Sequence, residues 1–474
     1  MHPLESHLRA VTRRTFLKNS GVGLGALGLG SLVSDSLFAA ASSTTRAPHF
    51  APRAKRVIYL NMVGAPSQLD LFDHKPALAA LDGKPCPDDF IQGKRFAFIR
   101  GHPHIAASRF EFARHGQSGA QISSLLPHLA GVADELASVR SLHTDEFNHA
   151  PAQLLLHTGF GRPGRPSGGS WITYGLGSEN SDLPAYVVLQ SGPLAGAGTQ
   201  LWSAGFLPSV HQGVQFRGSG EPVLFLDNPK NHSAADRRQV LDTVRALNQA
   251  QLADVGDPEI ATRIEQYELA FRMQTSVPEL MDISTESRAT LELYGAEPGK
   301  ASFANNCLLA RRLVERGVRL VQLYDADWDH HNNLATRLPV KCRDVDRGMA
   351  ALVRDLKQRG LLDDTLVIWG GEFGRTPMAQ TDTGNGNASN PGRDHHKEAY
   401  TIWLAGGGVK RGLTYGATDD LGYHIAENPV HVHDLNATLL HLLGLNHERL
   451  TYRYQGRDFR LTDVHGHVVK KLLA

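Results

Sequence analysis

The sequence predicts an α/β protein, built as a three-layer sandwich around a mostly parallel central sheet. Unbroken apolar runs bounded by glycine or proline, such as RVIYLNMVG at residues 56–64, are typical of strands that are covered on both faces. Segments with apolar residues at helical spacing lie between these runs. Strand and helix patterns that alternate in this way indicate parallel βαβ units, and therefore a sheet with helices on both faces.

The expected elements follow one another along most of the chain. Strands are expected at residues 56–64, 137–140, 185–190, 318–324, 365–370 and 400–406. Helices are expected at residues 120–137, 150–157, 234–252, 258–274, 303–316, 341–359 and 433–444. The glycine- and asparagine-rich stretch 381–396 is expected to be a loop, and in this architecture such loops at strand ends bind ligands. The segment from about 190 to 300 is interpreted as an insertion that shapes specificity.

The N-terminus has the pattern of an export signal. TRRTFLK at residues 12–18 places two arginines ahead of an apolar pair, and a glycine-rich apolar run and small residues at 39–41 follow. We expect a twin-arginine signal peptide at residues 1–41, a linker at 42–55 and an exported domain at 56–474. The apolar run is shorter than the roughly 20 residues of a spanning helix. The mature protein is therefore expected in the periplasm or outside the cell, without a stable membrane anchor.

Charge and composition exclude some functions and favour others. The net charge is +1 and no basic stripe is interleaved with aromatics, so a nucleic acid is not expected as a partner. Three cysteines, Cys86, Cys307 and Cys342, permit one disulfide but no disulfide framework, and their pairing stays open. Histidine is the outlier, because 24 copies are more than structural roles usually require. This excess favours metal or proton chemistry.

Two segments rich in aspartate and histidine predict a metal site. In YDADWDHHNN, Asp327 and His331 stand four residues apart with Asp329 between them, a spacing that puts ligands on one side of a helical turn. So many acidic groups would repel one another without a cation, although a solvated acidic loop is the alternative. The later segment GRDHH supplies His395 and His396 at the same expected edge of the sheet. The expected cofactor is a divalent metal, namely zinc, manganese or calcium.

Several segments together resemble one family in their order and spacing. They include VIYLNMVGAPSQLDLFDHKP, GQSGAQISSLLPHLA, LLDDTLVIWGGEFGRTP and GRDHH. This combination is similar to the exported bacterial proteins grouped as the domain of unknown function number 1501, and the likeness covers nearly the whole mature chain. That family looks like a branch of the alkaline phosphatase and sulfatase superfamily. The resemblance implies an alkaline-phosphatase-like sandwich with a metal site at the strand ends, where sulfate or phosphate esters are cleaved.

The resemblance places His149 where sulfatases carry their nucleophile. NHAPAQLLLHTG at residues 148–159 resembles the sulfatase pattern Cys-x-Pro-Ser-Arg, with Ala152 and Gln153 in place of the serine and the arginine. Without the cysteine and the arginine, the usual sulfatase reaction is not available. His149 is a candidate metal ligand, acid–base group or nucleophile, and a ligand is the most economical assignment. The alternative is a cap on the helix that follows.

The first strand departs from the superfamily most clearly. There it normally ends in a metal-binding aspartate, whereas here Asn61 or Met62 stands at that position. An ionised carboxylate would have to come from elsewhere. Asp70 and Asp73 are the candidates in the following segment.

The later positions are partly kept. The superfamily's Asp-His pair becomes Glu372-Phe373, in which the glutamate can still serve as a ligand or general base and the phenylalanine cannot. Arg375 lies where a guanidinium could grip an oxyanion, and a salt bridge to a neighbouring loop is its alternative role. The catalytic candidates are therefore His149, Glu372 and Arg375.

Two functions from different classes follow. The preferred one is hydrolysis of a sulfate or phosphate ester by metal-activated water. The alternative is a non-catalytic periplasmic binding or assembly protein on the same fold, which acts on a partner or a glycan surface. The missing superfamily residues favour the second function, and the dense aspartate and histidine segments favour the first. An anionic ester or a glycan is the expected ligand in either case.

Overall fold

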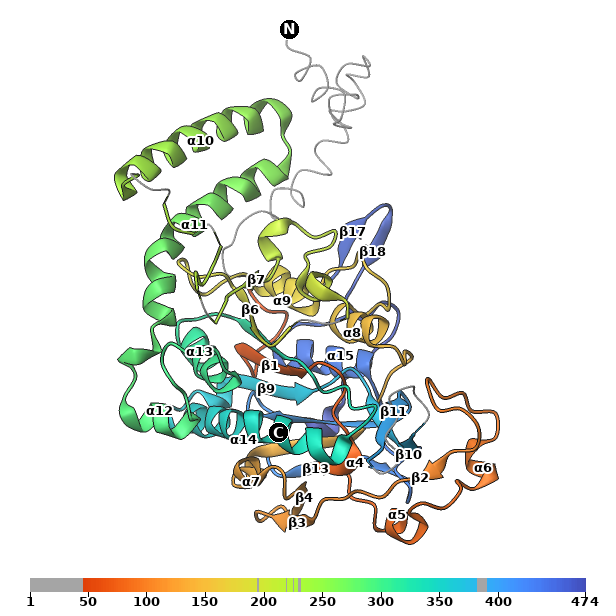
Figure 1. The fold of residues 1–474 in the computed structure, drawn as a ribbon. Coiled ribbons are helices and arrows are strands. Elements are labelled where there is room, and N and C mark those ends of the chain that lie inside the picture. The colour runs from red at the N-terminus through yellow and green to blue at the C-terminus, as the bar shows by residue number, and fades with distance from the viewer. Residues whose placement is uncertain (1–45, 194–195, 219, 225, 229–231, 382–389) are drawn as a thin grey trace.

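The computed structural model describes residues 46–474 except 194–195, 219, 225, 229–231 and 382–389, so the expected signal peptide lies outside the described residues. A nine-stranded sheet forms its centre (Figure 1). Eight strands lie in the order β13 (Leu413–Tyr415), β5 (Leu136–His143), β12 (Tyr400–Ala405), β9 (Thr365–Gly370), β1 (Arg56–Met62), β8 (Leu320–Asp325), β6 (Tyr186–Ser191) and β7 (Val214–Gln215). The ninth, β16 (Val430–His431), pairs with β5.

The sheet is mostly parallel. β1 pairs in parallel with β8 and β9, and β6 continues the parallel arrangement beyond β8. Only the β12 pairings, with β5 and with β9, are antiparallel along this path. β5 therefore runs in the same direction as β1, because two reversals separate them. The predicted fold class is confirmed.

Helices cover both faces of the sheet, and strand β1 shows why. Its side chains alternate, so that Ile58 and Leu60 pack into one core and Val57 and Tyr59 into the other. The first core is closed by α13 (Phe303–Glu315) and α14 (Leu334–Gln358). The second core is closed by α8 (His149–Thr158), α9 (Gly168–Leu176) and α15 (Val432–Leu442).

The strand directions bring distant segments to one edge of the sheet. The carboxyl ends of β5, β8 and β9 meet there, and β12 begins there. A small sheet lies beside this edge, in which β10 (Gly374–Gln380) pairs with β2 (His104–Ile105) and with β11 (Gly392–His396). Segments that are far apart in the sequence thus become neighbours at this edge.

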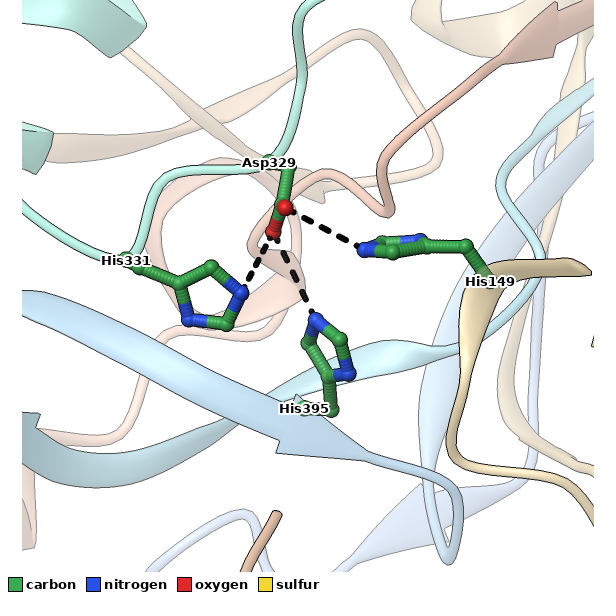
Figure 2. Close-up of side chains that lie close together, drawn as sticks. All are labelled: His149, Asp329, His331 and His395. Atoms are coloured by element: carbon green, nitrogen blue, oxygen red, sulfur yellow. Dashed lines mark ion pairs between the residues drawn. The ribbon is translucent and has the colours of Figure 1, made fainter. Parts of the chain in front are cut away.

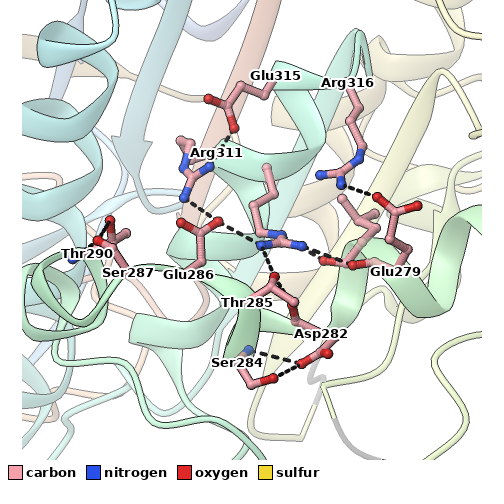
Figure 3. A network of polar contacts seen from close by, with 12 residues as sticks. Glu279, Asp282, Ser284, Thr285, Glu286, Ser287, Thr290, Arg311, Glu315 and Arg316 are labelled. Atoms are coloured by element: carbon pink, nitrogen blue, oxygen red, sulfur yellow. Dashed lines mark hydrogen bonds and ion pairs between the residues drawn. The ribbon is translucent and has the colours of Figure 1, made fainter.

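A helical hairpin stands out from the sandwich between β7 and β8 (Figure 1). Its long helices are α10 (Ala234–Val255) and α11 (Pro258–Met281), and α12 (Arg288–Tyr294) follows. Arginines of α13 join this part to the sandwich through a network of polar contacts with the end of α11 (Figure 3). The interpretation of residues 190–300 as an insertion stays a prediction.

The expected helix at 120–137 is wrong. The chain there forms β4 (Ala120–Ser123), paired with β3 (Phe112–His115), and then the short helix α7 (Pro127–Ala130). Pro127 explains the break, because a proline disfavours helical backbone in the preceding residue and readily begins a new helix. The apolar residues of this stretch therefore belong partly to the end of strand β4 and partly to the start of helix α7.

Two other boundaries differ from expectation. Residues Gly392–His396 of the expected loop form strand β11, because β10 offers them a pairing partner that no local pattern shows. Helix α14 begins at Leu334 rather than near residue 341 and takes Pro339 within its first turns. Pro339 is the sixth residue of α14 and lies beyond the first amides, which lack a partner in any helix, so it removes one backbone hydrogen bond within the helix.

The described part of the expected linker packs on the domain. The amide of Arg46 bonds to the carbonyl of Leu176, and the amide of Ala54 bonds to that of Leu442. Among the described residues, no helix combines the length and the apolar character needed to cross a membrane. Each of the three cysteines is buried, and none forms a disulfide: Cys86, Cys307 and Cys342.

Candidate metal centre

Four predicted site residues meet at the edge of the sheet where the parallel strands end. His149 begins α8 after β5, Asp329 and His331 lie in the loop after β8, and His395 lies in β11 before β12. One nitrogen or oxygen atom of each residue lies within 4.8 Å of those of the other three (Figure 2). We call these four residues the Asp329 cluster.

The carboxylate of Asp329 lies at the middle of the cluster. Its Oδ1 atom is 2.9 Å from Nε2 of His331 and 3.5 Å from Nε2 of His395. Its Oδ2 atom is 3.3 Å from Nε2 of His149. All three imidazoles therefore present the same ring nitrogen, Nε2, to one carboxylate (Figure 2).

The other ring nitrogen of each histidine is held from outside the cluster. Nδ1 of His149 lies 2.7 Å from a carboxylate oxygen of Glu372. Nδ1 of His331 lies 2.7 Å from Oε1 of Gln380, and Nδ1 of His395 lies 2.7 Å from the backbone carbonyl of Phe147. Each of these partners accepts, so each Nδ1 carries a proton, and in a neutral ring Nε2 then has its lone pair directed to the centre. This is the arrangement found around metal-binding histidines.

Orphaned atoms show that the cluster fits a cation. Nε2 of His149 and Nε2 of His395 are buried and have no hydrogen-bond partner. Buried polar atoms without a partner are rare, because losing water without replacement is costly. A metal ion among the three nitrogens and the carboxylate would satisfy both atoms.

Charge in the cluster is strongly perturbed. Burial raises the pKa of Asp329, but its close contacts with the three histidines hold that pKa well below its usual range. Burial likewise opposes the charge of His149, but contacts with Asp329 and Glu372 outweigh it and raise the pKa of His149 to about 9. Burial lowers the pKa of His395 to about 4. The buried carboxylates thus attract positive charge, which a proton on His149 or a metal ion can supply.

Glu372 lies behind His149, outside the Asp329 cluster. Its side chain is fully buried and accepts hydrogen bonds from His149, from Gln153 at 3.1 Å and from the amide of Gly64 at 3.1 Å. Burial raises its pKa, but the contact with His149 and the other hydrogen bonds lower it overall, so Glu372 is ionised. The structure therefore places Glu372 where it orients His149 rather than where it would bind the metal itself.

Arg375 has no free donor edge for an oxyanion. Its side chain is 1% exposed and donates to the carbonyls of Ala65, Gly64 and Arg393. Its Nη2 atom also lies 2.5 Å from Oδ1 of Asp329. The structure thus gives Arg375 its alternative role, a salt bridge to a neighbouring loop, which fixes the carboxylate of Asp329.

Two predicted metal ligands lie outside the cluster. Asp327 is exposed and pairs with Arg337 at 2.6 Å, because its backbone turns through a positive φ of 72°. His396 is buried on the other side of β11, where its Nε2 bonds to the carbonyl of Tyr423 at 2.7 Å. Successive residues of a strand point to opposite faces, so His395 and His396 cannot both face one site.

The carboxylate missing from the first strand is not replaced from the following segment. Asn61 lies at the end of β1, where its side-chain amide contacts His157. Asp70 is bound by Arg393 at 2.7 Å, and Asp73 contacts Lys75 and Thr418. Neither aspartate belongs to the Asp329 cluster.

Some residues that position the cluster have no signal in the sequence. Gln380 and Phe147 hold His331 and His395, and Phe147 does so through its backbone. Phe373 packs against the rings of His149 and His395, with centroids 5.0 and 4.6 Å away. Backbone acceptors and packing contacts of this kind depend on the tertiary fold.

Solved structures with a similar arrangement include three bacterial proteins. The lipoteichoic acid synthase LtaP from Listeria monocytogenes is 10% identical over 88% of this chain and 78% of that chain, with a TM-score of 0.37. A protein in the alkaline phosphatase superfamily from Vibrio parahaemolyticus is 10% identical over 85% and 69%, with a TM-score of 0.37. The PsFucS1 sulfatase from Pseudoalteromonas sp. is 13% identical over 84% and 69%, with a TM-score of 0.34.

Because these TM-scores lie below 0.5, the functional proposal depends on the site of this chain alone. No curated protein matches the chain significantly. The family described as protein of unknown function (DUF1501) matches residues 54–473, nearly all of the described chain, and the chain therefore belongs to that family.

Proposed function

We propose that this chain is an exported, metal-dependent hydrolase of an anionic ester, either a sulfate or a phosphate. Its Asp329 cluster would hold one divalent cation. The observation that carries the proposal is the common orientation of His149, His331 and His395, each held at Nδ1 by its own acceptor and open at Nε2. Three separate acceptors hold these rings, and together they would fix the geometry of the ligands before any ion binds.

The donor set favours zinc among the expected metals. Three imidazole nitrogens and one carboxylate oxygen are typical zinc ligands. These four ligands would complete a tetrahedral zinc ion, so an ester would bind the ion at a fifth position or in place of one ligand. Manganese takes more oxygen ligands, and calcium prefers six to eight oxygens. A bound cation of this kind supplies a Lewis acid for the ester and lowers the pKa of water to near neutrality.

The residues of the chain would orient the substrate by charge. Arg375 pairs with Asp329, and Glu372 lies behind His149, so a divalent ion would be the group at the centre that attracts an anionic ester. Asp329 has 38% of its side chain exposed, which provides access from solvent.

His149 is assigned to hold the cation rather than to attack the ester. Its Nδ1 is committed to Glu372, and its Nε2 faces Asp329 at the centre. An attacking imidazole would need a nitrogen that is free of both. Glu372 and Gln153 then serve as positioning residues for His149 and for each other.

Export through the twin-arginine pathway is part of the proposal. The arginine pair and the apolar run that support it belong to residues 1–41, and this pathway carries proteins that fold and acquire a cofactor before transport. Fractionation of cells that produce the full chain tests it. An Arg13→Lys, Arg14→Lys variant should leave the protein in the cytoplasm, and unchanged periplasmic location would overturn this part.

Turnover with matched variants tests the hydrolase. The metal-stripped protein, reloaded with zinc, should hydrolyse 4-nitrophenyl sulfate or 4-nitrophenyl phosphate, and His395→Ala should abolish this activity. His396→Gln is the control, because His396 lies on the other side of β11, away from the Asp329 cluster. Equal turnover by His395→Ala and the zinc-loaded wild type would contradict the proposal.

Two observations favour the non-catalytic alternative. Arg375 is buried and held by three carbonyls and by Asp329, and Asn61 stands where the resemblance implies a carboxylate, so the site has fewer groups for chemistry than the superfamily pattern. A binding or assembly protein would show a lower melting temperature without zinc and no turnover of either ester. The same zinc-loaded and metal-stripped samples therefore separate the two functions.

A further inference from the structure

An exposed phenylalanine ring lies against the metal centre. Phe98 is 41% exposed, and the centroid of its ring lies 4.8 Å from that of His331 and 5.3 Å from that of His395. Both contacts are edge-on. A phenyl ring in this position touches two candidate ligands and still offers surface to solvent.

The segment that carries Phe98 is fixed in place by a buried carboxylate. We call residues 94–102 the Phe98 loop. Asp394, which is fully buried beside His395, accepts hydrogen bonds from the amides of Phe98 at 2.8 Å and Ile99 at 3.0 Å. Burial of a carboxylate costs free energy unless hydrogen bonds compensate for it. The two amides that bond to Asp394 therefore fix the position of this loop.

A second exposed phenylalanine comes from another segment at the same centre. Phe147 has 46% of its surface exposed, and its carbonyl is the acceptor that holds His395. It stands two residues before His149. Two exposed aromatic side chains thus belong to segments that contact the Asp329 cluster directly. Large exposed apolar groups beside a polar site are typical of ligand binding.

The Phe98 loop also carries positive charge without a partner. Lys94 is paired with Glu398 at 2.8 Å, but Arg95 and Arg100 are exposed and form no ion pair with a described residue. Arginine offers two parallel hydrogen bonds to a sulfate or phosphate group. The loop therefore combines an aromatic surface with two available guanidinium groups.

We infer that the Phe98 loop recognises a ring-bearing substrate with more than one anionic ester group, such as a multiply sulfated or phosphorylated sugar. Phe98 packs on the apolar face of the ring, while Arg95 and Arg100 bind an anionic group other than the one at the metal centre. This inference rests on the proposed function, because it places one ester group at the Asp329 cluster. A phenol ester also offers a ring face but lacks the second charge.

Binding calorimetry with the zinc-loaded protein tests the inference. The probes are sucrose octasulfate, which has rings and many charges, tripolyphosphate, which has charges without a ring, and phenyl phosphate, which has a ring and one ester group. Phe98→Leu keeps the packing on the histidines but removes the aromatic face. It should weaken sucrose octasulfate about tenfold and leave tripolyphosphate unchanged. Phe98→Tyr should retain the wild-type affinity.

Further variants separate recognition from structure. Arg95→Gln combined with Arg100→Gln should weaken both polyanions and leave phenyl phosphate unchanged. Phe160→Leu is the aromatic control, because Phe160 is 37% exposed but follows the far end of α8, about 15 Å from His149. Zinc content must stay equal in all variants, since a purely structural role of Phe98 would lower it.

The outcomes are distinguishable from those of the hydrolase proposal. Equal affinity of the wild type and Phe98→Leu for sucrose octasulfate would overturn the inference, as would no binding by the wild type. Stronger binding of phenyl phosphate than of sucrose octasulfate would overturn the inference of a sugar and indicate a phenol ester as the substrate. A protein that retains no zinc would instead overturn the proposed function.

Discussion

Glu372 lies 2.7 Å from Nδ1 of His149, and this contact decides which nitrogen of His149 faces the Asp329 cluster. The same carboxylate oxygen also accepts from Gln153 and from the amide of Gly64, so Oε1 of Glu372 has three donors around it. A buried carboxylate of this kind raises the basicity of the histidine that it orients. Both the charge and the position of Glu372 are therefore expected to affect metal binding at the Asp329 cluster.

Glu372→Gln should therefore weaken metal binding without unfolding the protein. The amide keeps an acceptor for His149 but loses the charge, and we expect the zinc affinity to fall by about 10- to 100-fold. Competition with a chromogenic zinc chelator measures this change. Asp346→Asn is a matched control, because Asp346 is also buried but holds the amides of His128 and Leu129 instead. Equal zinc affinity in Glu372→Gln and the wild type would contradict the assignment.

Stability should fall in acid because His157 is buried and neutral. Burial lowers the pKa of His157 to about 4, although the charge of Glu372 acts in the opposite direction. Histidine in the unfolded chain titrates near pH 6.5, so between about pH 6.5 and 4 only the unfolded chain binds this proton. Its contribution is present above pH 6.5 and is lost as the pH falls, by about 3 kcal/mol in full.

Replacing His157 by glutamine should flatten that dependence. Urea unfolding of His157→Gln and the wild type at pH 7.5, 5.5 and 4.5 measures it, and the metal site is common to both proteins. The free energies of unfolding of the wild type and of His157→Gln should approach each other as the pH falls, because only the wild type loses stability through His157. A constant difference across the three pH values would contradict the neutral, buried state of His157.

Arg312 should anchor the helical hairpin on the sandwich. It is buried on α13 and donates to the carbonyls of Leu280 at 2.8 Å and Glu279 at 3.0 Å, and to the carboxylate of Glu286 at 2.7 Å. Removing one partner of a buried ion pair costs about 3–5 kcal/mol. Arg312→Ala should therefore make the helical hairpin sensitive to protease at temperatures below the melting temperature of the sandwich.

Arg316 provides the comparison on the same helix. It pairs with Glu279 at 3.0 Å, and its side chain is 34% exposed, so Arg316→Ala should cost about 0–1 kcal/mol. Zinc content should not change in either variant, because the network lies away from the cluster. Equal protease resistance of Arg312→Ala and Arg316→Ala would show that Arg312 is no anchor.

The strands of the core could be predicted from the sequence because each depends on local pattern. Runs such as residues 365–370 are apolar without interruption, and they became central strands. Strand β11 could not be predicted, because it exists only through pairing with β10. The expected helix at 120–137 failed because Pro127 divides a stretch whose apolar spacing resembles one helix.

The candidate site could be predicted in part for a similar reason. The resemblance to the sulfatase pattern identified His149, and the two segments rich in aspartate and histidine identified Asp329, His331 and His395. The expected parallel sheet was the reason to place these segments at one edge. It could not separate His395 from His396, since the strand that gives them opposite directions was expected to be a loop. The acceptors Gln380 and Phe147 were not predicted, because only the tertiary fold brings them to the histidines.

Elemental analysis of the mature protein tests the central claim most directly. The protein is purified from the periplasm without chelator or affinity metal, beside His395→Ala and His396→Gln. The structure predicts about one equivalent of a divalent metal, with zinc expected, in the wild type and in His396→Gln, and a loss of that metal in His395→Ala. A wild-type protein without metal, or equal metal in His395→Ala, would contradict the assignment of the Asp329 cluster as a metal centre.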